Sequence, residues 1–299
     1  MAKQPDDKNP VGLDGFLSDD LAPAFWTPEL LDEPGKWWPH VPFAFWLVTA
    51  TRPRVIVDLG VERGVSYSAF CEAARRLQPN IQCHAVDPWL GGESGRPSGD
   101  RRFDDFTQFH DHRYASFSQL MRMSSAAALD AFADGSIDLL HIDASGQPDE
   151  AREDYSRWRV KMSPSGVVLI HGVRSHGDRL DLGWPFDEIS DGAPRFLFPQ
   201  GEGLALFAAG GQPPEAITKL GGLGESETQR VRQRFAFLGA RWAEAATIRD
   251  VLKQFESDIQ TLTAKDDNFR LTLADRTWNS LVKTVANPFR YFDSGRRQR

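Results

Sequence analysis

The feature that most constrains the fold is a short apolar run, Arg54-Val-Ile-Val-Asp58, which ends in a carboxylate and is followed closely by Gly60 and Gly64. A short apolar run without polar alternation is typical of a strand buried on both faces of a parallel sheet. The two glycines let the backbone after the strand pass close to a neighbouring group, where a Cβ would collide. The sequence therefore predicts a buried strand whose carboxyl end faces a ligand.

Strand and helix patterns alternate regularly after this point. Apolar runs predict strands, and 3.6-residue spacing predicts helices between them. The expected strands are 81–86, 118–122, 136–143 and 167–171, and the expected helices are 66–77, 103–112, 126–132 and 150–160. A closing hairpin is expected from 196–198 and 204–207, joined through glycines. Repeated β-α-β units predict an open α/β sheet, mostly parallel, with helices on both faces and a terminal antiparallel hairpin.

The chain divides into three parts: a polar N-terminal arm over residues 1–35, the α/β domain over 36–211, and a helical C-terminal extension over 212–299. Within the domain, the aromatic-rich stretch 37–50 is expected to form a helix that covers one edge of the sheet. Glycine-rich linkers precede the extension, at 210–214 and 221–224. Its apolar residues have helical spacing with one register break: Val231, Phe235, Leu238, Trp242, Leu252, Phe255, Ile259 and Leu262. Such spacing fits either a short coiled coil or a helix packed on the domain.

Charge and composition exclude several classes of protein. The net charge is −7, and the part before Gln212 holds 20 Lys and Arg against 31 Asp and Glu, while the rest holds 15 against 11. An acidic main domain argues against a nucleic-acid substrate, because neutralising phosphates requires clustered cations. No apolar run approaches the roughly 20 residues of a membrane span, and the N-terminus lacks the apolar stretch of a secretory signal. Cys71 and Cys83 both fall in segments expected to be buried, so we expect a cytoplasmic location rather than a disulfide framework.

The residues at the predicted strand ends indicate the ligand. The spacing of Gly60 and Gly64 is Gly-x-x-x-Gly, so the phosphate cradle of a dinucleotide site is missing and an NAD-dependent oxidoreductase is disfavoured. Asp58 would repel a pyrophosphate but suits the cationic amino group of a methionine moiety. Asp87 ends the second strand, where a carboxylate can accept hydrogen bonds from both ribose hydroxyls. Together these residues favour S-adenosylmethionine as the cofactor.

With these motifs in order, the stretch from about 38 to 210 resembles the class I methyltransferase domains of bacterial saccharide-biosynthesis loci, which often occur beside or fused to glycosyltransferases. The matching segments are His40–Trp46, Val57–Gly60, Gly64–Tyr67, Phe70–Cys71, Ala85–Trp89, Tyr114–Ser118, Gly135–Asp143, Lys161–Pro164, Gly166–His171 and Gly201–Leu204. The resemblance implies a Rossmann-like seven-stranded sheet. It also implies that Asp58, Gly60, Gly64, Ser66 and Tyr67 surround the methionine part of the cofactor, that Asp87 and Trp89 contact ribose and adenine, and that Ser124 approaches the adenine.

The departures from that family concern the catalytic end. The family's histidine after the fourth strand is Gly146 here, and its aspartate after the fifth strand is Gly172. Losing two of the expected ligands leaves too few groups for a divalent metal, so no metal site is predicted. Proton removal from an acceptor needs a general base, and the convergent candidates are His141, Asp143 and His171.

The remaining polar residues are given other roles. We expect His110 and His112 to lie at the surface. Asp154 and Trp158 are expected to support the helix after the fourth strand.

Two functions remain open from the sequence. The first is an O-methyltransferase acting on a glycan or small-molecule hydroxyl, expected to be a sugar hydroxyl in surface-glycan biosynthesis, with acceptor contacts in loops 91–102 and 174–184. The second is a catalytically weakened relative that serves as a binding or assembly module with a glycosyltransferase, which the glycines at 146 and 172 favour. In both cases the C-terminal helices are a candidate surface for a homo-oligomer.

Overall fold

The structure is a computed structural model, and it describes residues 19–30, 35–77, 80–90, 99–144, 148–173, 175–176, 179–180 and 192–265. The strands are β1 (Val55–Leu59), β2 (Gln82–Val86), β3 (Ser118–Met121), β4 (Ile137–Asp143), β5 (Met162–His171), β6 (Ser175–His176), β7 (Arg179–Leu180), β8 (Arg195–Phe198) and β9 (Leu204–Ala208). The helices are η1 (Asp19–Phe25), η2 (Trp38–His40), α2 (Val41–Thr51), α3 (Val65–Leu77), α4 (Gly99–Tyr114), α5 (Ser125–Ala128), η3 (Leu129–Ala131), α6 (Pro148–Trp158), η4 (Arg159–Lys161), α8 (Glu215–Gly221) and α9 (Glu225–Lys265).

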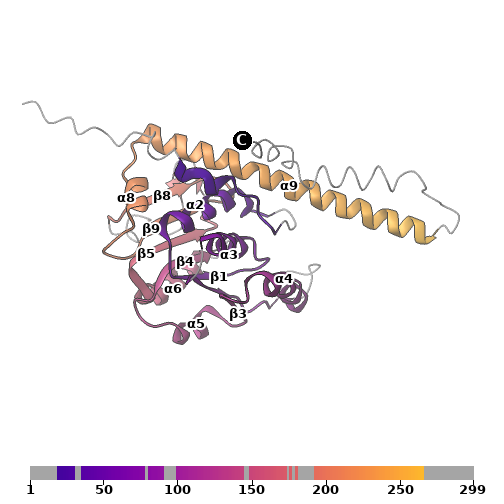
Figure 1. The fold of residues 1–299 in the computed structure, drawn as a ribbon, viewed down its shortest axis with the longest axis horizontal. Helices are drawn as coiled ribbons and strands as arrows, with labels where there is room; N and C mark the ends of the chain where they lie inside the picture. Colours follow the sequence, from indigo (N-terminus) through magenta and orange to yellow (C-terminus); the bar gives the residue numbers. More distant parts are fainter. Residues whose placement is uncertain are drawn as a thin grey trace, which may run out of the picture.

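Within these residues seven strands form one sheet in the order β3-β2-β1-β4-β5-β9-β8 (Figure 1). Strands β1 to β5 pair in parallel, whereas β9 runs antiparallel to β5 and β8 antiparallel to β9. This is the class I methyltransferase layout that the sequence predicts, including the terminal hairpin. The strand order reverses between β1 and β4, and ligands of open α/β sheets bind at the carboxyl ends of strands beside such a reversal.

Each face of the sheet has its own apolar core. The side chains of Ile56, Leu139 and Leu169 lie in one core together with α2, α3 and the first half of α9. The alternate residues, such as Val57 and Leu140, lie in a second core with α5 and α6. Because strand side chains alternate between faces, Asp58 shares the face of Ile56 and His141 shares that of Leu139. The polar strand ends therefore lie on the side covered by the N-terminal segments and α9.

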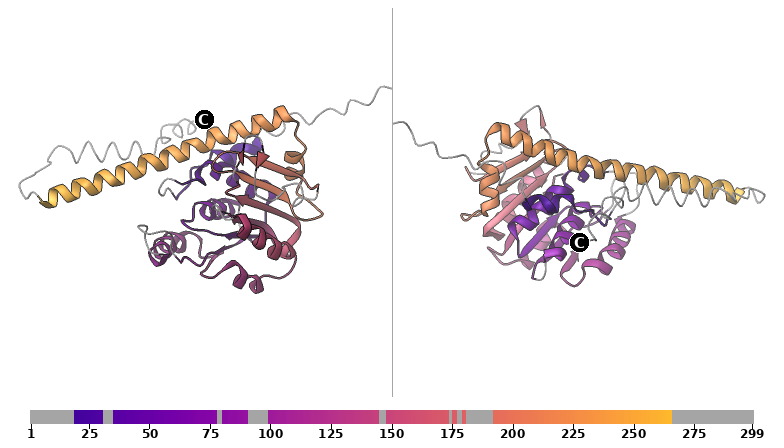
Figure 2. Two further views of the ribbon diagram at one scale, coloured as in Figure 1. Left: turned by 180° about the vertical axis from the view of Figure 1, so that it is seen from behind. Right: turned by 45° about the horizontal axis from the view of Figure 1, so that its top comes forward.

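Helix α9 crosses the top of the domain and extends far beyond it (Figures 1 and 2). Its first half buries Val231, Phe235, Leu238 and Trp242, and each such side chain contributes about 1.5–3 kcal/mol on burial. The helix approaches η2 so closely that a Cβ at Gly239 would lie 2.1 Å from the carbonyl oxygen of Pro39. The first half of α9 is therefore part of the domain, and it presses on the segment that leads to the polar strand ends.

The structure modifies some of the expected elements. The predicted helix 37–50 begins later, as η2 and α2, and it packs against the sheet near its β8 edge, with the Phe43 and Phe198 ring centroids 4.5 Å apart. Residues 19–30 of the expected arm pack on the domain, where Leu21 is 2% exposed. Helix α8 lies within the expected helical extension, whereas the small β6–β7 hairpin was not expected from the sequence, because its strands are short. Among the described helices, none is long and apolar enough to cross a membrane.

Candidate functional site

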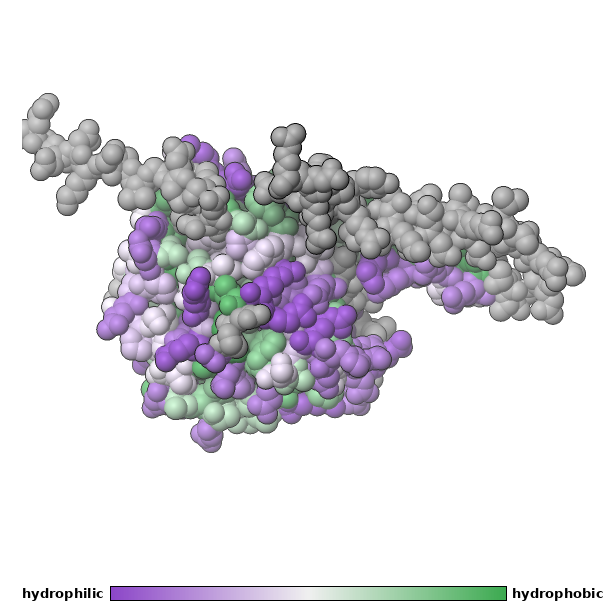
Figure 3. Space-filling model, in the orientation of Figure 1, coloured by the Kyte–Doolittle hydropathy of each residue, from purple (hydrophilic) through white to green (hydrophobic). Residues whose placement is uncertain are grey.

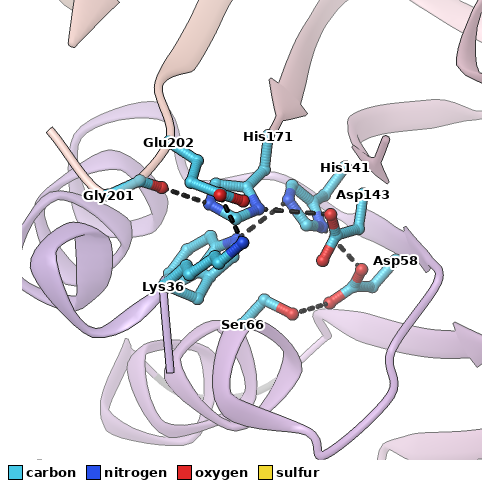
Figure 4. A network of polar contacts seen from close by, with 9 residues as sticks. Lys36, Asp58, Ser66, His141, Asp143, His171, Gly201 and Glu202 are labelled. Atoms are coloured by element: carbon cyan, nitrogen blue, oxygen red, sulfur yellow. Dashed lines mark hydrogen bonds and ion pairs between the residues drawn. The ribbon is translucent and has the colours of Figure 1, made fainter. Parts of the chain in front are cut away.

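Two aspartate–histidine pairs lie side by side at the carboxyl ends of β1, β4 and β5 (Figure 4). Asp58 is the register partner of His141, and Asp143 is the register partner of His171. Register partners point to the same face of a sheet, and His141 and Asp143 are two residues apart on one strand. The strand pairing alone therefore brings all four side chains together on one face.

The inner pair, Asp58 and His141, is completely buried. Asp58 Oδ1 accepts a hydrogen bond from His141 Nδ1 over 2.6 Å, and Asp58 Oδ2 accepts one from the Ser66 hydroxyl over 2.7 Å. On its other side, His141 Nε2 lies 3.1 Å from the indole Nε1 of Trp37. An indole nitrogen only donates, so Nε2 accepts and the proton of His141 is on Nδ1. His141 is thus a neutral imidazole held between two partners.

The outer pair, Asp143 and His171, is nearer to solvent. His171 Nε2 lies 2.8 Å from the carbonyl oxygen of Gly201, and because a carbonyl only accepts, Nε2 carries a proton. His171 Nδ1 is 3.2 Å from Asp143 Oδ1, so a further proton lies between these two atoms. The Asp143 side chain is 13% exposed, against 4% for His171. Asp143 is therefore the group of the outer pair that a bound molecule can reach, with His171 behind it.

A third histidine, His40, lies behind the outer pair. Its side chain is buried, and its ring centroid is 5.4 Å from that of His171. Burial lowers the pKa of His40 well below its ordinary value, and the neighbouring His171 lowers it further. Within the described part of the chain neither ring nitrogen of His40 has a hydrogen-bond partner. His40 is thus neutral and limits how much positive charge this cluster can hold.

Asp87 holds together the two loops that follow β1 and β2. Its Oδ2 accepts a hydrogen bond from the Glu62 backbone over 2.9 Å, and its Oδ1 accepts one from the Trp89 backbone over 2.6 Å. The Trp89 indole in turn donates to the Glu62 carbonyl over 3.0 Å. Glu62 and Trp89 both have positive φ, at 49° and 45°, an uncommon conformation that gathers at functional sites. Burial raises the pKa of Asp87, and the nearby carboxylates of Asp58 and Asp143 raise it too.

The two glycines of the turn have positive φ, as a close approach of backbone requires. At each glycine, the position that a Cβ would occupy is next to another protein group. A Cβ at Gly64 would lie 2.0 Å from the Phe106 ring of α4, and one at Gly60 would lie 3.2 Å from Cβ of Asp143. Phe106 is a neighbour that sequence reasoning missed, because α4 follows a loop whose length hides where the helix docks.

Other expected site residues lie apart from this cluster. The Tyr67 hydroxyl is 2.6 Å from the Ser118 hydroxyl at the start of β3, so it points away from the carboxyl ends of the strands. Ser124 is exposed and caps α5, where its Oγ accepts from the Ala127 backbone over 3.3 Å. Asp154 accepts a hydrogen bond from Ser125 over 2.5 Å, in keeping with the supporting role expected for it.

The expectation that His110 lies at the surface is wrong. His110 is 2% exposed, and its Nε2 is 2.7 Å from the Ser118 hydroxyl, while His112 is exposed as expected. The ring of His110 lies beside the rings of Tyr67, Phe106 and Tyr114, on the face of α4 that packs against the domain. The charged residues between these positions in the sequence concealed that face.

Trp37 and Gly201 are the functional neighbours that sequence reasoning missed. Trp37 belongs to the aromatic-rich stretch that was expected to cover an edge of the sheet, and Gly201 contributes only its backbone carbonyl. The segment before η2 is held to the β8–β9 turn by an ion pair between Lys36 and Glu202 (Figure 4). Gly146, the loop 91–98 and most of 174–184 lie outside the described residues. Gly172 has φ of 80°, a conformation that the family's aspartate adopts only with strain.

Comparisons with known proteins find similar sequences and structures. Residues 57–173 match a family model described as a methyltransferase domain. A protein of Sinorhizobium fredii, uncharacterized protein y4gI, is 35% identical over 234 residues, which are 77% of this chain. The chain spans 25% of the length of that relative. The family model therefore covers the part of the chain that runs from β1 to just past β5.

Solved structures with a similar arrangement include a methyltransferase from Geobacter sulfurreducens, with 13% identity, a TM-score of 0.43, and coverage of 57% of this chain and 78% of that one. Another is the O-methyltransferase TomG from Streptomyces achromogenes in complex with SAM, with 18% identity, a TM-score of 0.41, and coverage of 58% and 80%.

Proposed function

We propose that this chain binds S-adenosylmethionine beside β1, β2 and β4 and transfers its methyl group to a hydroxyl. The observation that carries the proposal is the set of three carboxylates, Asp58, Asp87 and Asp143, at the ends of adjacent strands where the strand order reverses. After burial, the carboxylates of Asp58 and Asp143 both raise the pKa of Asp87, which supports the three groups acting on one another. Neighbouring carboxylates favour a cation and disfavour a pyrophosphate.

The residues present fit a sulfonium cofactor in defined roles. Asp87 has one lone-pair direction of each oxygen engaged by the backbone, and the remaining directions are available to two ribose hydroxyls. Asp58 is completely buried behind His141 and Ser66, so its contribution to a bound ammonium is through charge rather than direct contact. When bound, the cofactor supplies an electrophilic methyl group on a positively charged sulfur.

Asp143 would act as the general base toward the acceptor. It is the more exposed member of the outer pair, and the acceptor hydroxyl must lose its proton as the methyl group arrives. His171, anchored by the Gly201 carbonyl, orients Asp143 and balances its charge. His141 is excluded from this role, because Trp37 and Asp58 occupy both of its ring nitrogens. A sugar hydroxyl in glycan assembly is the acceptor class that the sequence resemblance implies.

Calorimetric titration with S-adenosylmethionine and S-adenosylhomocysteine tests the cofactor proposal. We expect the native chain to bind both, and Asp87→Ala to weaken binding about 10- to 100-fold, the loss of charge-assisted hydrogen bonds to ribose. Asp130→Ala, which removes an exposed carboxylate on η3, is the matched control and should bind normally. Failure of the native chain to bind either compound contradicts the proposal.

Release of S-adenosylhomocysteine in the presence of sugars, nucleotide sugars and simple phenols then tests turnover. Release with any hydroxyl acceptor supports the transferase. Binding without release on any member of the panel favours the module that binds cofactor and partner without turnover.

A further inference from the structure

The second half of α9 carries an apolar stripe that its own domain does not cover. Ile248, Leu252, Phe255 and Ile259 follow one another at spacings of four, three and four residues. Ile248 is 44% exposed and Phe255 is 53% exposed. This part of the helix extends beyond the domain (Figures 1 and 2), and hydrophobic colour appears among hydrophilic residues near its far end (Figure 3). We call these four residues the distal stripe.

The distal stripe faces a different direction from the buried stripe of the first half. At 3.6 residues per turn, the mean direction of 248–259 lies about 120° around the helix from that of 231–246. The domain surface that receives Val231 and Trp242 therefore cannot be extended to cover Phe255. An occupant of the distal stripe must approach α9 from another side.

We propose that the distal stripe is a self-association surface on which a second copy of this chain docks its own α9 in antiparallel orientation. The spacing of the stripe is the a/d pattern of a two-stranded coiled coil, which packs like residues against like. An antiparallel pair also places the two domains at opposite ends of the paired segment, because the part packed on each domain ends near Ala246. The paired segment, residues 245–262, is about 27 Å long.

The charges beside the stripe are complementary in the antiparallel orientation. With Leu252 opposite Phe255 of the second copy, Arg249 lies beside Glu256 of the second copy, and the two-fold symmetry repeats this pair. A parallel pair would also bring opposite charges together, because its flanking positions set Glu244 against Arg249. Charge complementarity therefore supports a symmetric dimer, and the placement of the two domains at opposite ends of the paired segment favours the antiparallel orientation.

Sedimentation velocity of the full chain over a range of concentrations up to about 100 μM tests the proposal. We expect the native chain to show a concentration-dependent dimer and Phe255→Glu to remain monomeric. Ser257→Glu adds the same charge on the opposite side of α9 and should dimerise normally. Because neither substitution touches the strand ends, binding of S-adenosylhomocysteine serves only to show that each variant is folded, and the result does not depend on the proposed function.

A charge exchange tests the orientation. Arg249→Glu and Glu256→Arg should each weaken dimerisation about tenfold, because like charges then face one another twice, and the double variant should restore it. A native chain that stays monomeric overturns the proposal; in that case the stripe is covered by another part of the same molecule or by a different protein. A dimer that Phe255→Glu leaves intact overturns it as well, and failure of the double variant to recover overturns the antiparallel orientation.

Discussion

The Trp37 indole donates a hydrogen bond to His141 Nε2 over 3.1 Å, while His141 Nδ1 donates to Asp58. The contact joins a residue before η2 to the centre of the sheet, 104 positions later in the chain. It makes His141 a positioning residue for Asp58 and leaves the outer pair, Asp143 and His171, as the pair available for proton transfer.

Trp37→Phe should destabilise the fold by about 1–3 kcal/mol beyond the loss of packing, because a buried imidazole nitrogen then loses its donor. Urea unfolding of the variant measures this difference. Trp26→Phe is the matched control: Trp26 packs on Phe45 with ring centroids 5.7 Å apart and does not serve a histidine. If both substitutions lower the free energy of unfolding by the same amount, the hydrogen bond from Trp37 to His141 does not stabilise the fold beyond packing.

Asp143→Asn should lower the rate of methyl transfer about 10²- to 10⁴-fold, the contribution of a positioned general base, with a much smaller effect on cofactor affinity. The measurement is steady-state release of S-adenosylhomocysteine alongside calorimetric binding. Because His171 acts through Asp143, the double variant with His171→Asn should be little slower than Asp143→Asn alone. Asp149→Asn, an exposed carboxylate at the start of α6, is the control. Fully additive losses would mean that the two residues act separately.

The predictable part of this molecule is the part set by local pattern. The runs ending at Asp58, Asp87, Asp143 and His171 are apolar enough to be recognised as buried strands, and parallel pairing then places their ends at one edge. What the sequence did not reveal are contacts between segments far apart in the chain. Trp37 contacts His141 next to η2, and η2 is held against the domain by α9, whose Gly239 lies against Pro39. Contacts between such distant segments leave no local pattern in the sequence. His110 was misjudged because of the charged residues around it in the sequence, although it follows Phe103 and Phe106 at helical spacing on the face that packs against Tyr67.

Ser118→Ala should destabilise the fold by about 1–3 kcal/mol, because the Ser118 hydroxyl serves two buried partners at once. It lies 2.6 Å from the Tyr67 hydroxyl and 2.7 Å from His110 Nε2. Without it both groups lose their main hydrogen bond in a region from which water is largely excluded. Ser136→Ala removes an exposed hydroxyl whose bond is to the Ala133 carbonyl, and it should cost little. Chemical unfolding of the two variants measures their free energies of unfolding. Equal losses of stability would contradict the stabilising role of the hydrogen bonds from Ser118 to Tyr67 and His110.

Glu72 should make the fold less stable as pH rises. Its side chain is completely buried on α3, where Oε1 accepts a hydrogen bond from the Glu29 backbone over 2.7 Å while Arg76 is 3.9 Å from Oε2. Burial raises the pKa of Glu72 from its ordinary 4.5 to about 7. Between these values Glu72 holds a proton in the folded chain that it has released in the unfolded chain. The contribution of Glu72 to the free energy of unfolding is therefore most favourable below pH 4.5 and falls until about pH 7.

Glu72→Gln removes this titration and keeps an oxygen for the Glu29 backbone. We therefore expect the variant to be more stable than the native chain at pH 8, by an amount on the order of 3 kcal/mol, and to differ little from it at pH 5. Urea unfolding at the two pH values measures the change. Glu153→Gln removes an exposed carboxylate paired with Arg157 on α6 and should show no such dependence on pH. An equal effect of Glu72→Gln at both pH values would show that the buried carboxyl is ionised throughout, with Arg76 compensating its charge.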